Sequence, residues 1–104
     1  MNDTYMKHVF SFSAFVLPYP GMAAWRFVTL PHNISDEISV RYKTQKKGWG
    51  SIPVLVTVGK TSWETSIFPD KKSRSYLLPM KLEVRKKEGI MDRDKIELSL
   101  SIRI

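Results

Sequence analysis

The chain has 104 residues, of which 42% are hydrophobic and 26% are charged, which is typical of a folded globular protein and argues against a disordered one. Seventeen Lys and Arg side chains outnumber ten Asp and Glu, and the formal charge of +7 favours anionic partners. The absence of Cys excludes disulfides, thiolate metal ligands and cysteine nucleophiles.

The length suits one compact unit, so we predict a single domain over residues 1–104. An apolar run at residues 9–17 is too short to cross a bilayer, which needs about 20 residues. Ser11 and Ser13 inside this run, and Pro18 after it, favour a strand over a secretory signal. We therefore expect a cytoplasmic protein that does not enter a membrane.

The first half of the chain predicts two strands and a helix. The first strand covers residues 7–17, and one face of it carries Phe10, Phe12, Ala14 and Val16. The second strand covers residues 25–30 and ends at Pro31. Ser35 is the expected N-cap of the following helix, which reaches the lysines before Gly48. Three apolar side chains recur at helical spacing in it: Ile34, Ile38 and Tyr42.

The middle of the chain predicts a β-hairpin. Residues 52–58 alternate between apolar and mixed positions, with Ile52, Val54, Val56 and Val58 on one side. Gly59 and Lys60 form a tight turn, and residues 62–68 return as the second strand with Trp63 and Ile67 on one face. A charged loop follows.

The last third predicts a short strand, a basic helix and a long final strand. After the strand at residues 76–78, Pro79 is the expected first residue of a helix that ends at Gly89. A turn at residues 92–94 leads to the last strand, in which one face is apolar and the other polar. The apolar positions are Ile96, Leu98, Leu100, Ile102 and Ile104.

Two segments share one pattern of strand, Leu-Pro, helix, turn and strand, at residues 25–58 and 74–102. Only Leu30-Pro31 and Leu78-Pro79 match literally, so chance is an alternative explanation. A true repeat would allow two half-barrels to close on each other within one chain, which predicts a monomer.

Several motifs, taken in order, resemble the domain of unknown function 1905 family. They are Trp-Arg-Phe-Val at 25–28, Leu-Pro at 30–31, Gly-Trp-Gly-Ser-Ile-Pro-Val at 48–54, Trp-Glu-Thr-Ser-Ile-Phe-Pro at 63–69, Tyr-Leu-Leu-Pro-Met-Lys at 76–81, Val-Arg-Lys at 84–86 and Gly-Ile at 89–90. The resemblance implies a mainly β, bacterial-type protein: a small closed or double-split antiparallel β-barrel with two helices packed at its ends. It implies no established activity. The family often has Gly-Asp before the last strand, whereas this chain has Arg93-Asp94.

One hypothesis for function is a site for a small anionic or polar ligand, or for a protein partner. Its candidate residues are Ser66, Tyr76, Lys81, Arg85 and Trp63, with Trp25 as an alternative apolar wall. Arg85 would be the anchor, because a guanidinium holds a carboxylate or phosphate with two hydrogen bonds. The structural alternative is that Arg85 pairs with Glu64 or Asp94 and that Tyr76 packs in the core.

A second hypothesis is nucleic-acid binding, because the last third also resembles the AbrB-like regulators, which bind DNA as dimers. The basic surface would carry Lys43, Lys46, Lys47, Trp49, Lys86 and Lys87. Their position near the negative ends of helices explains Lys46, Lys47, Lys86 and Lys87 as solvated residues without any ligand, and we favour this explanation. No base-reading motif accompanies them.

An enzyme is the least favoured class. His8 and His32 are the two histidines, and no closely spaced His, Asp or Glu predicts a metal site. A phosphate-binding glycine loop and a serine-histidine pattern are also missing, so we expect no cofactor. The sequence thus predicts a non-enzymatic binding domain.

Overall fold

The computed structural model describes residues 8–103, apart from the side chains of Gln45 and Trp49. Its strands are β1 (Val9–Phe15), β2 (Leu17–Tyr19), β3 (Met22–Thr29), β4 (Ile52–Val58), β5 (Thr61–Asp70), β6 (Ser75–Pro79) and β7 (Lys95–Ile102). The helices are α1 (His32–Arg41) and α2 (Leu82–Glu88), and two 3-10 turns, η2 (Lys43–Gln45) and η3 (Gly48–Gly50), precede β4.

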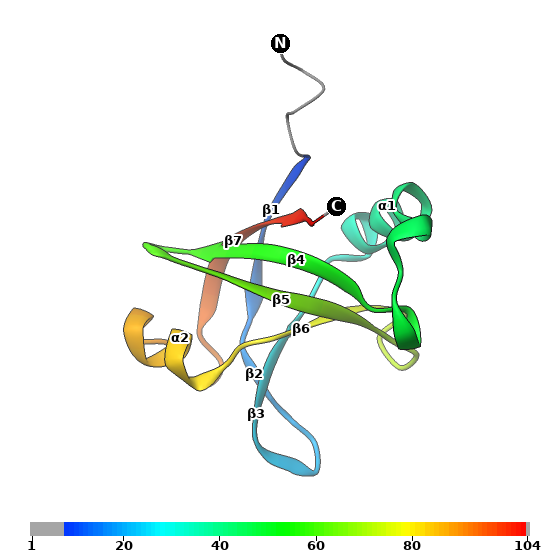
Figure 1. The fold of residues 1–104 in the computed structure, drawn as a ribbon. Helices are drawn as coiled ribbons and strands as arrows, with labels where there is room; N and C mark the ends of the chain where they lie inside the picture. The colour runs from blue at the N-terminus through cyan, green and yellow to red at the C-terminus, as the bar shows by residue number, and fades with distance from the viewer. Residues whose placement is uncertain (1–7, 104) are drawn as a thin grey trace.

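The seven strands form one antiparallel, curled sheet in the order β1-β7-β4-β5-β6-β3-β2, with α1 and α2 on opposite sides of the molecule (Figure 1). The mainly β architecture with two helices is confirmed, and the sheet has the form of a curled half-barrel. Its closure into a double-split barrel stays a prediction. None of the helices in the described residues has the length and apolar character that crossing a membrane requires.

The predicted first strand is divided in two at Val16, which is fully buried. Its N–H donates to the carbonyl of Asp94 over 2.9 Å, and its carbonyl accepts the N–H of Arg93 over 2.7 Å. Before Val16 the chain pairs with β7, and after it the chain pairs with β3. One continuous segment therefore supplies both ends of the strand order. Lys7, the predicted start of this strand, lies outside the described residues.

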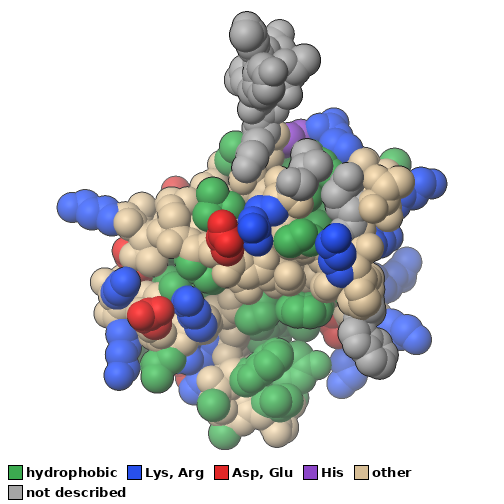
Figure 2. Space-filling view, viewed as in Figure 1, with side chains coloured by type: hydrophobic (Ala, Val, Ile, Leu, Met, Phe, Trp, Pro, Cys, Tyr) green, Lys and Arg blue, Asp and Glu red, His purple; other side chains and the backbone are tan. Residues whose placement is uncertain are grey.

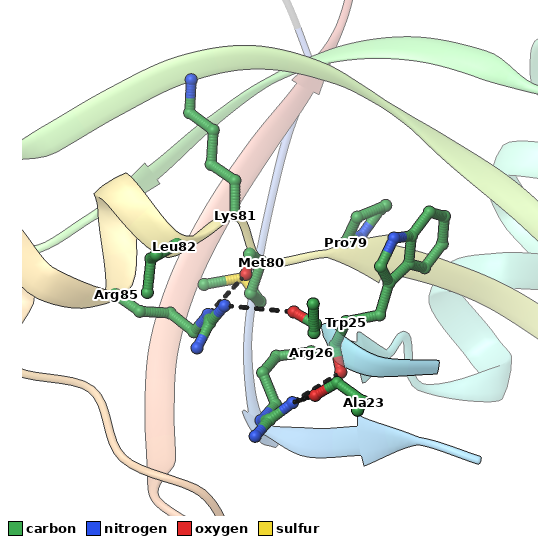
Figure 3. A pocket seen from close by; sticks show the side chains of 9 residues that line it. Ala23, Trp25, Arg26, Pro79, Met80, Lys81, Leu82 and Arg85 are labelled. Atoms are coloured by element: carbon green, nitrogen blue, oxygen red, sulfur yellow. Dashed lines mark hydrogen bonds between the residues drawn. The ribbon is translucent and has the colours of Figure 1, made fainter. Parts of the chain in front are cut away.

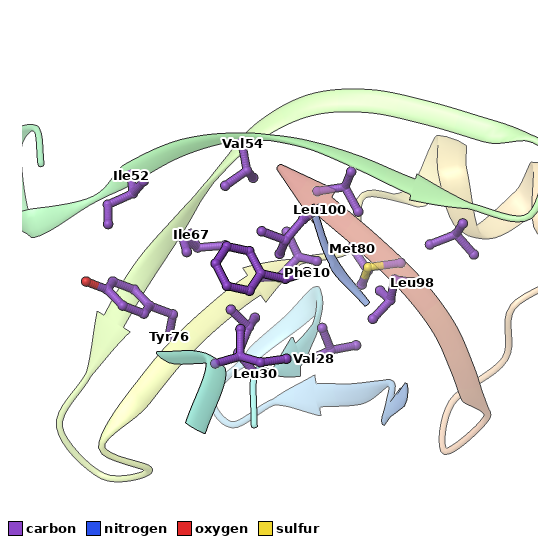
Figure 4. Close-up of a cluster of buried hydrophobic side chains, with 14 of the residues drawn as sticks. Phe10, Val28, Leu30, Ile52, Val54, Ile67, Tyr76, Met80, Leu98 and Leu100 are labelled. Atoms are coloured by element: carbon purple, nitrogen blue, oxygen red, sulfur yellow. The ribbon is translucent and has the colours of Figure 1, made fainter. Parts of the chain in front are cut away.

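Side chains from both ends of the chain fill one interior (Figure 4). The inward faces of the strands meet there as alternation predicts, because successive residues of a strand point to opposite sides. The labelled members of this cluster are Phe10, Val28, Leu30, Ile52, Val54, Ile67, Tyr76, Met80, Leu98 and Leu100. On β7 the predicted polar face is partly wrong, because Ser101 is also buried. Ile104 lies outside the described residues.

Helix α1 begins earlier than predicted. Its N-cap is Pro31, so Ser35 lies inside the helix and is buried rather than being the cap. The Ser35 hydroxyl accepts a hydrogen bond of 3.1 Å from the backbone N–H of Tyr76 in β6. The apolar spacing was read correctly, since Ile34, Ile38 and Tyr42 are all buried. The serine thus joins the helix to the sheet.

Helix α2 begins later than predicted. Pro79 is the last residue of β6, and Lys81 is the N-cap. The predicted end is confirmed, because Gly89 has the left-handed values φ 64° and ψ 35°. The N–H of Ile90 donates to the carbonyl of Arg85 over 2.8 Å, as expected for a Schellman cap, and both Val84 and Ile90 are buried.

The repeat is visible in the structure, but with a different alignment. The two N-caps, Pro31 and Lys81, are 50 residues apart, and β3 and β6 pair with each other around Val28 and Leu78, which are also 50 residues apart. Two reciprocal hydrogen bonds follow the same relation: Leu30 N–H donates to Tyr76, and Met80 N–H donates to Arg26. Leu30-Pro31 therefore corresponds to Met80-Lys81, and the literal match with Leu78-Pro79 is two residues out of register.

Candidate functional site

A pocket of about 600 Å³ opens where β3 and β6 meet the start of α2 (Figure 3). This volume lies within the range of small-molecule sites. We call it the arginine pocket, and its lining consists of Ala23, Ala24, Trp25, Arg26, Pro79, Met80, Lys81, Leu82 and Arg85. Strand pairing brings the two walls together, because Phe27 of β3 lies opposite Pro79 of β6.

Arg85 is held in the arginine pocket by backbone carbonyls. Its Nε donates to the carbonyl of Met80 over 2.8 Å, and one terminal nitrogen lies 3.5 Å from the carbonyl of Ala24. These contacts occupy two of the five N–H donors of a guanidinium. No carboxylate in the described residues forms an ion pair with Arg85, so the remaining donors are available to a ligand.

The structural alternative for Arg85, a pair with Glu64 or Asp94, is not found. Glu64 lies 3.3 Å from a guanidinium nitrogen of Arg103. Asp94 accepts the backbone N–H of Met91 over 2.8 Å in the turn before β7. Both carboxylates therefore serve other contacts.

Arg26 supplies a second guanidinium, and its geometry is more constrained. Its Nε lies 2.5 Å from a carboxylate oxygen of Asp92, and a terminal nitrogen donates to the carbonyls of Ala23 and Trp25 over 2.7 and 3.0 Å. Because Asp92 neutralises part of this charge, Arg85 is the stronger anchor for an anion. The Lys81 side chain runs away from both guanidinium groups in Figure 3 and lies 3.5 Å from Glu83.

The rest of the arginine pocket is apolar. The Trp25 indole is 47% exposed and lies beside Pro79, and Leu82 at the opposite wall is 53% exposed. An arginine beside an exposed aromatic ring offers a ligand both a charged contact and a surface for its apolar atoms.

A second, smaller pocket of about 270 Å³ lies against α1 and includes Tyr76. Its lining is rich in hydroxyl groups, which come from Ser35, Ser39, Ser75 and Tyr76. Burial raises the pKa of Tyr76 above its ordinary value, although a hydrogen bond with Ser39 opposes the shift. The tyrosine is therefore a neutral hydrogen-bonding group at physiological pH.

Asp70 also lines this second pocket and is held as a carboxylate. The hydroxyl and the backbone N–H of Ser73 lower its pKa below the ordinary value, and Lys72 adds a smaller effect in the same direction. The backbone N–H of Ser73 lies 2.9 Å from a carboxylate oxygen. With Lys46, Lys71 and Arg74 nearby, the second pocket carries charges of both signs.

A family model described as a domain of unknown function, DUF1905, matches residues 12–100. The chain belongs to the DUF1905 family. The match extends from β1 into β7 and includes both pockets, and it confirms the resemblance read from the motifs. No curated protein sequence matches the chain. Similarity to the AbrB-like regulators stays a prediction.

In this DUF1905 chain the five predicted ligand residues do not line one pocket. Lys81 and Arg85 line the arginine pocket, whereas Tyr76 lines the second one. Ser66 lies on β5 opposite Pro53 of β4. Trp63 is 8% exposed and belongs to the core, so Trp25 is the tryptophan that forms the wall.

The 50-residue relation explains this division. Arg26 corresponds to Tyr76, and Arg85 corresponds to Ser35, so the arginine pocket and the second pocket are equivalent places in the two halves of the DUF1905 fold. One half carries guanidinium groups where the other carries hydroxyls. The sequence prediction combined residues from both.

Arg26 was not predicted, although the sequence holds a signal for it. The signal is a single charged residue that follows an uncharged stretch at residues 17–25 and is next to Trp25. The register of β3 against β6 determines that this residue lies near α2. Recognising it requires the correct repeat alignment, which the Leu-Pro match obscured.

The residues predicted for nucleic-acid binding form two separate groups. Lys43, Lys46 and Lys47 follow α1, whereas Lys86 and Lys87 lie on α2, at the other side of the molecule (Figure 1). The ammonium of Lys46 lies 3.4 Å from the Ser39 hydroxyl. The side chain of Trp49 lies outside the described part of the chain. The predicted set therefore does not form one continuous surface.

Proposed function

We propose that this DUF1905 chain is a non-enzymatic binding domain that holds a small anionic ligand in the arginine pocket. The observation that supports this proposal is the position and the unpaired charge of Arg85 within the described residues. Its guanidinium is fixed by backbone carbonyls, lies in a hollow of ligand size and has no carboxylate partner within the described residues. A positioned arginine with free donors loses little side-chain entropy when an anion binds.

The ligand that fits best carries a carboxylate or phosphate next to an apolar group. Arg85 binds the anionic oxygens, and Arg26 adds positive charge on the neighbouring strand. The apolar part of the ligand packs on Trp25 and Pro79. A ligand with charge alone would leave this wall exposed to water, so it would bind more weakly.

Thermal unfolding in the presence of small anions tests the proposal. The panel contains inorganic phosphate, acetate, and aliphatic and aromatic carboxylates. A ligand at tenfold its Kd stabilises the folded state by about 1.4 kcal/mol, which raises the Tm by roughly 6–11 °C. We expect aromatic carboxylates to raise the Tm of the wild type and to have little effect on Arg85→Ala.

The matched control is Lys87→Ala, which removes one positive charge from the same helix but not from the pocket. Because Arg85 also bonds to Met80, the measured quantity is the ligand-induced shift within each variant and not the Tm itself. An equal shift in wild type and Arg85→Ala would contradict the proposal, as would a panel without any shift.

Nucleic-acid binding is the alternative, supported by the net charge of +7 and the exposed lysines near both helices. The separation of these lysines favours the arginine pocket instead. Titration of a labelled duplex and a labelled single strand across a range of salt concentrations discriminates between the two, because phosphate contacts give a steep loss of affinity with salt. Tight, salt-dependent binding unaffected by Arg85→Ala would favour the alternative.

A further inference from the structure

The arginine pocket is one end of a longer groove. Next to it lies a hollow of about 330 Å³, which shares Trp25 and Pro79 with the arginine pocket. A third hollow of about 560 Å³ shares Tyr19, Phe27 and Leu77 with this 330 Å³ hollow. The second and third of these hollows lie over the outer face of β3 and β6, which carries Phe27 and Leu77, and the arginine pocket adjoins them at Trp25 and Pro79. We call these three adjoining hollows the aromatic groove.

The outer face of an antiparallel sheet is normally polar, since it faces water. Here it is aromatic: Tyr19 packs edge-on against Trp25 and Phe27, with ring centroids 6.0 and 5.4 Å apart. Phe68 of the neighbouring strand is 40% exposed, and Met22 is 45% exposed. Figure 2 shows hydrophobic side chains gathered over the β2–β3 hairpin, while Lys and Arg lie toward the two sides. Exposed apolar groups that gather in this way mark an interaction surface.

Both ends of the aromatic groove are positively charged. Arg26 and Arg85 lie at one end, and Lys71 and Lys72 line the hollow at the other. Asp70 also lines this end as a carboxylate bonded to the N–H of Ser73, so two lysines face one acidic side chain and the end keeps a net positive charge. A ligand complementary to this pattern has an apolar centre and a negative charge at each end.

We propose that the aromatic groove binds an extended peptide of a partner protein, in which apolar residues are flanked by acidic ones. This inference rests on the proposed function and deepens it: the anion held by Arg85 is a carboxylate of the peptide. Strand β6 (Ser75–Pro79) runs along the groove, and the four steps of about 3.3 Å between its first and last residues span about 13 Å, so four or five extended residues fit between the charged ends. Aromatic grooves favour extended and proline-rich segments, whose ordering costs little entropy.

A second copy of the chain does not fit the groove. In either orientation the cationic ends of one copy would face those of the other, and each copy carries a net charge of +7. The charge pattern therefore selects an acidic partner.

A library of immobilised octapeptides tests the inference. The central four residues are either apolar and proline-containing or polar, and the flanks are acidic, neutral or basic, with each peptide made with a free and an amidated C-terminus. We expect binding to concentrate in peptides with apolar centres and acidic flanks. A free C-terminus that substitutes for one acidic flank would identify the terminal carboxylate as the group at Arg85. Binding spread evenly over the classes, or concentrated in another class, would overturn the inference.

Variants locate the binding on the groove. Trp25→Ala and Phe68→Ala should each weaken the best peptide by about tenfold or more, as for central aromatic contacts in other interfaces. Phe15→Ala is the matched control, because Phe15 is 56% exposed but lines none of the three hollows. Equal effects of Phe15→Ala and Phe68→Ala would overturn the inference.

The two proposals fail in different ways. If aromatic carboxylates stabilise the wild type through Arg85 but no peptide class is enriched, the peptide inference is wrong and the proposed function stands. If peptides bind through Phe68 but Arg85→Ala has no effect on them or on small anions, both the proposed function and the assignment of the carboxylate are wrong. Sedimentation at high concentration completes the test, since self-association abolished by Trp25→Ala would place a second copy in the groove and overturn the inference.

Discussion

The backbone N–H of Arg93 donates to the carbonyl of Val16 over 2.7 Å, although Arg93 has the left-handed value φ 71°. This bond fixes the turn before β7 to the break between β1 and β2. Glycine adopts this left-handed geometry without strain, and the chain adopts it here with an arginine. Arg93 therefore stores backbone strain at a point where two segments meet.

Replacing Arg93 by Gly should stabilise the protein. The left-handed conformation costs a residue with a side chain about 1–2 kcal/mol, and the greater freedom of glycine in the unfolded chain offsets part of the gain. We expect the free energy of unfolding in urea to rise by about 0.5–1 kcal/mol. Arg93→Ala is the control, because it removes the guanidinium and keeps the strain. Equal stability of the two variants would show that φ is not the cause.

Gly59 and Gly89 should respond differently to alanine, although their φ values of 57° and 64° are similar. Only at Gly59 does an added methyl group meet the carboxylate of Glu88, which accepts hydrogen bonds from Lys60 N–H and the Thr61 hydroxyl. We expect Gly89→Ala to cost about 1–2 kcal/mol and Gly59→Ala about 1 kcal/mol more. Chemical denaturation measures both costs. In a Glu88→Ala background the difference should disappear, and its persistence would contradict this explanation.

Ser35→Ala in helix α1 should destabilise the protein through a backbone group of strand β6. The Ser35 hydroxyl is the acceptor for the buried N–H of Tyr76, and its removal leaves that donor without a partner. We expect a loss of about 1–3 kcal/mol in the free energy of unfolding. Ser13→Ala, at an exposed position of β1, should change it by less than about 0.5 kcal/mol. A loss at Ser35 no larger than at Ser13 would argue against the bond.

Tyr76 should make the fold sensitive to alkaline pH. Burial raises its pKa above the ordinary value of 10.0, so the folded state holds the phenol proton more tightly than the unfolded state does. The resulting stability is complete below pH 10 and is lost as the pH rises from 10 through the raised pKa. We expect the stability of the wild type to fall more steeply with pH in this window than that of Tyr76→Phe. Parallel pH profiles would contradict the raised pKa.

Much of the fold followed from the sequence because side-chain alternation reports directly on which face of a strand is buried. The bounds of β4, the turn at Gly59 and the glycine cap at Gly89 were predicted correctly. Errors occurred where a contact distant in sequence decides the local structure. The break at Val16 depends on the turn at residues 92–94, and the buried role of Ser35 depends on β6.

The candidate site was predicted only in part for the same reason. Arg85 was identified by its chemistry, but its neighbours are determined by the register between β3 and β6. Pro79 was predicted to begin a helix because proline suits the first helical position, whereas the structure places it at the end of strand β6, beside Trp25. Alternation within each strand identified most of the core, but it does not show which strands are neighbours, so it did not predict the pocket.

The pairing of β1 with β7 places Val9 opposite Ser101, so the chain enters and leaves the sheet at neighbouring positions. In Figure 1 these positions lie at the top, whereas the β2–β3 hairpin projects from the bottom. The described part of the chain therefore begins and ends on the side remote from the hairpin. Immobilisation through a side chain near Val9 or Ser101 should leave the aromatic side chains of the hairpin facing free solution, which suits surface-based measurements.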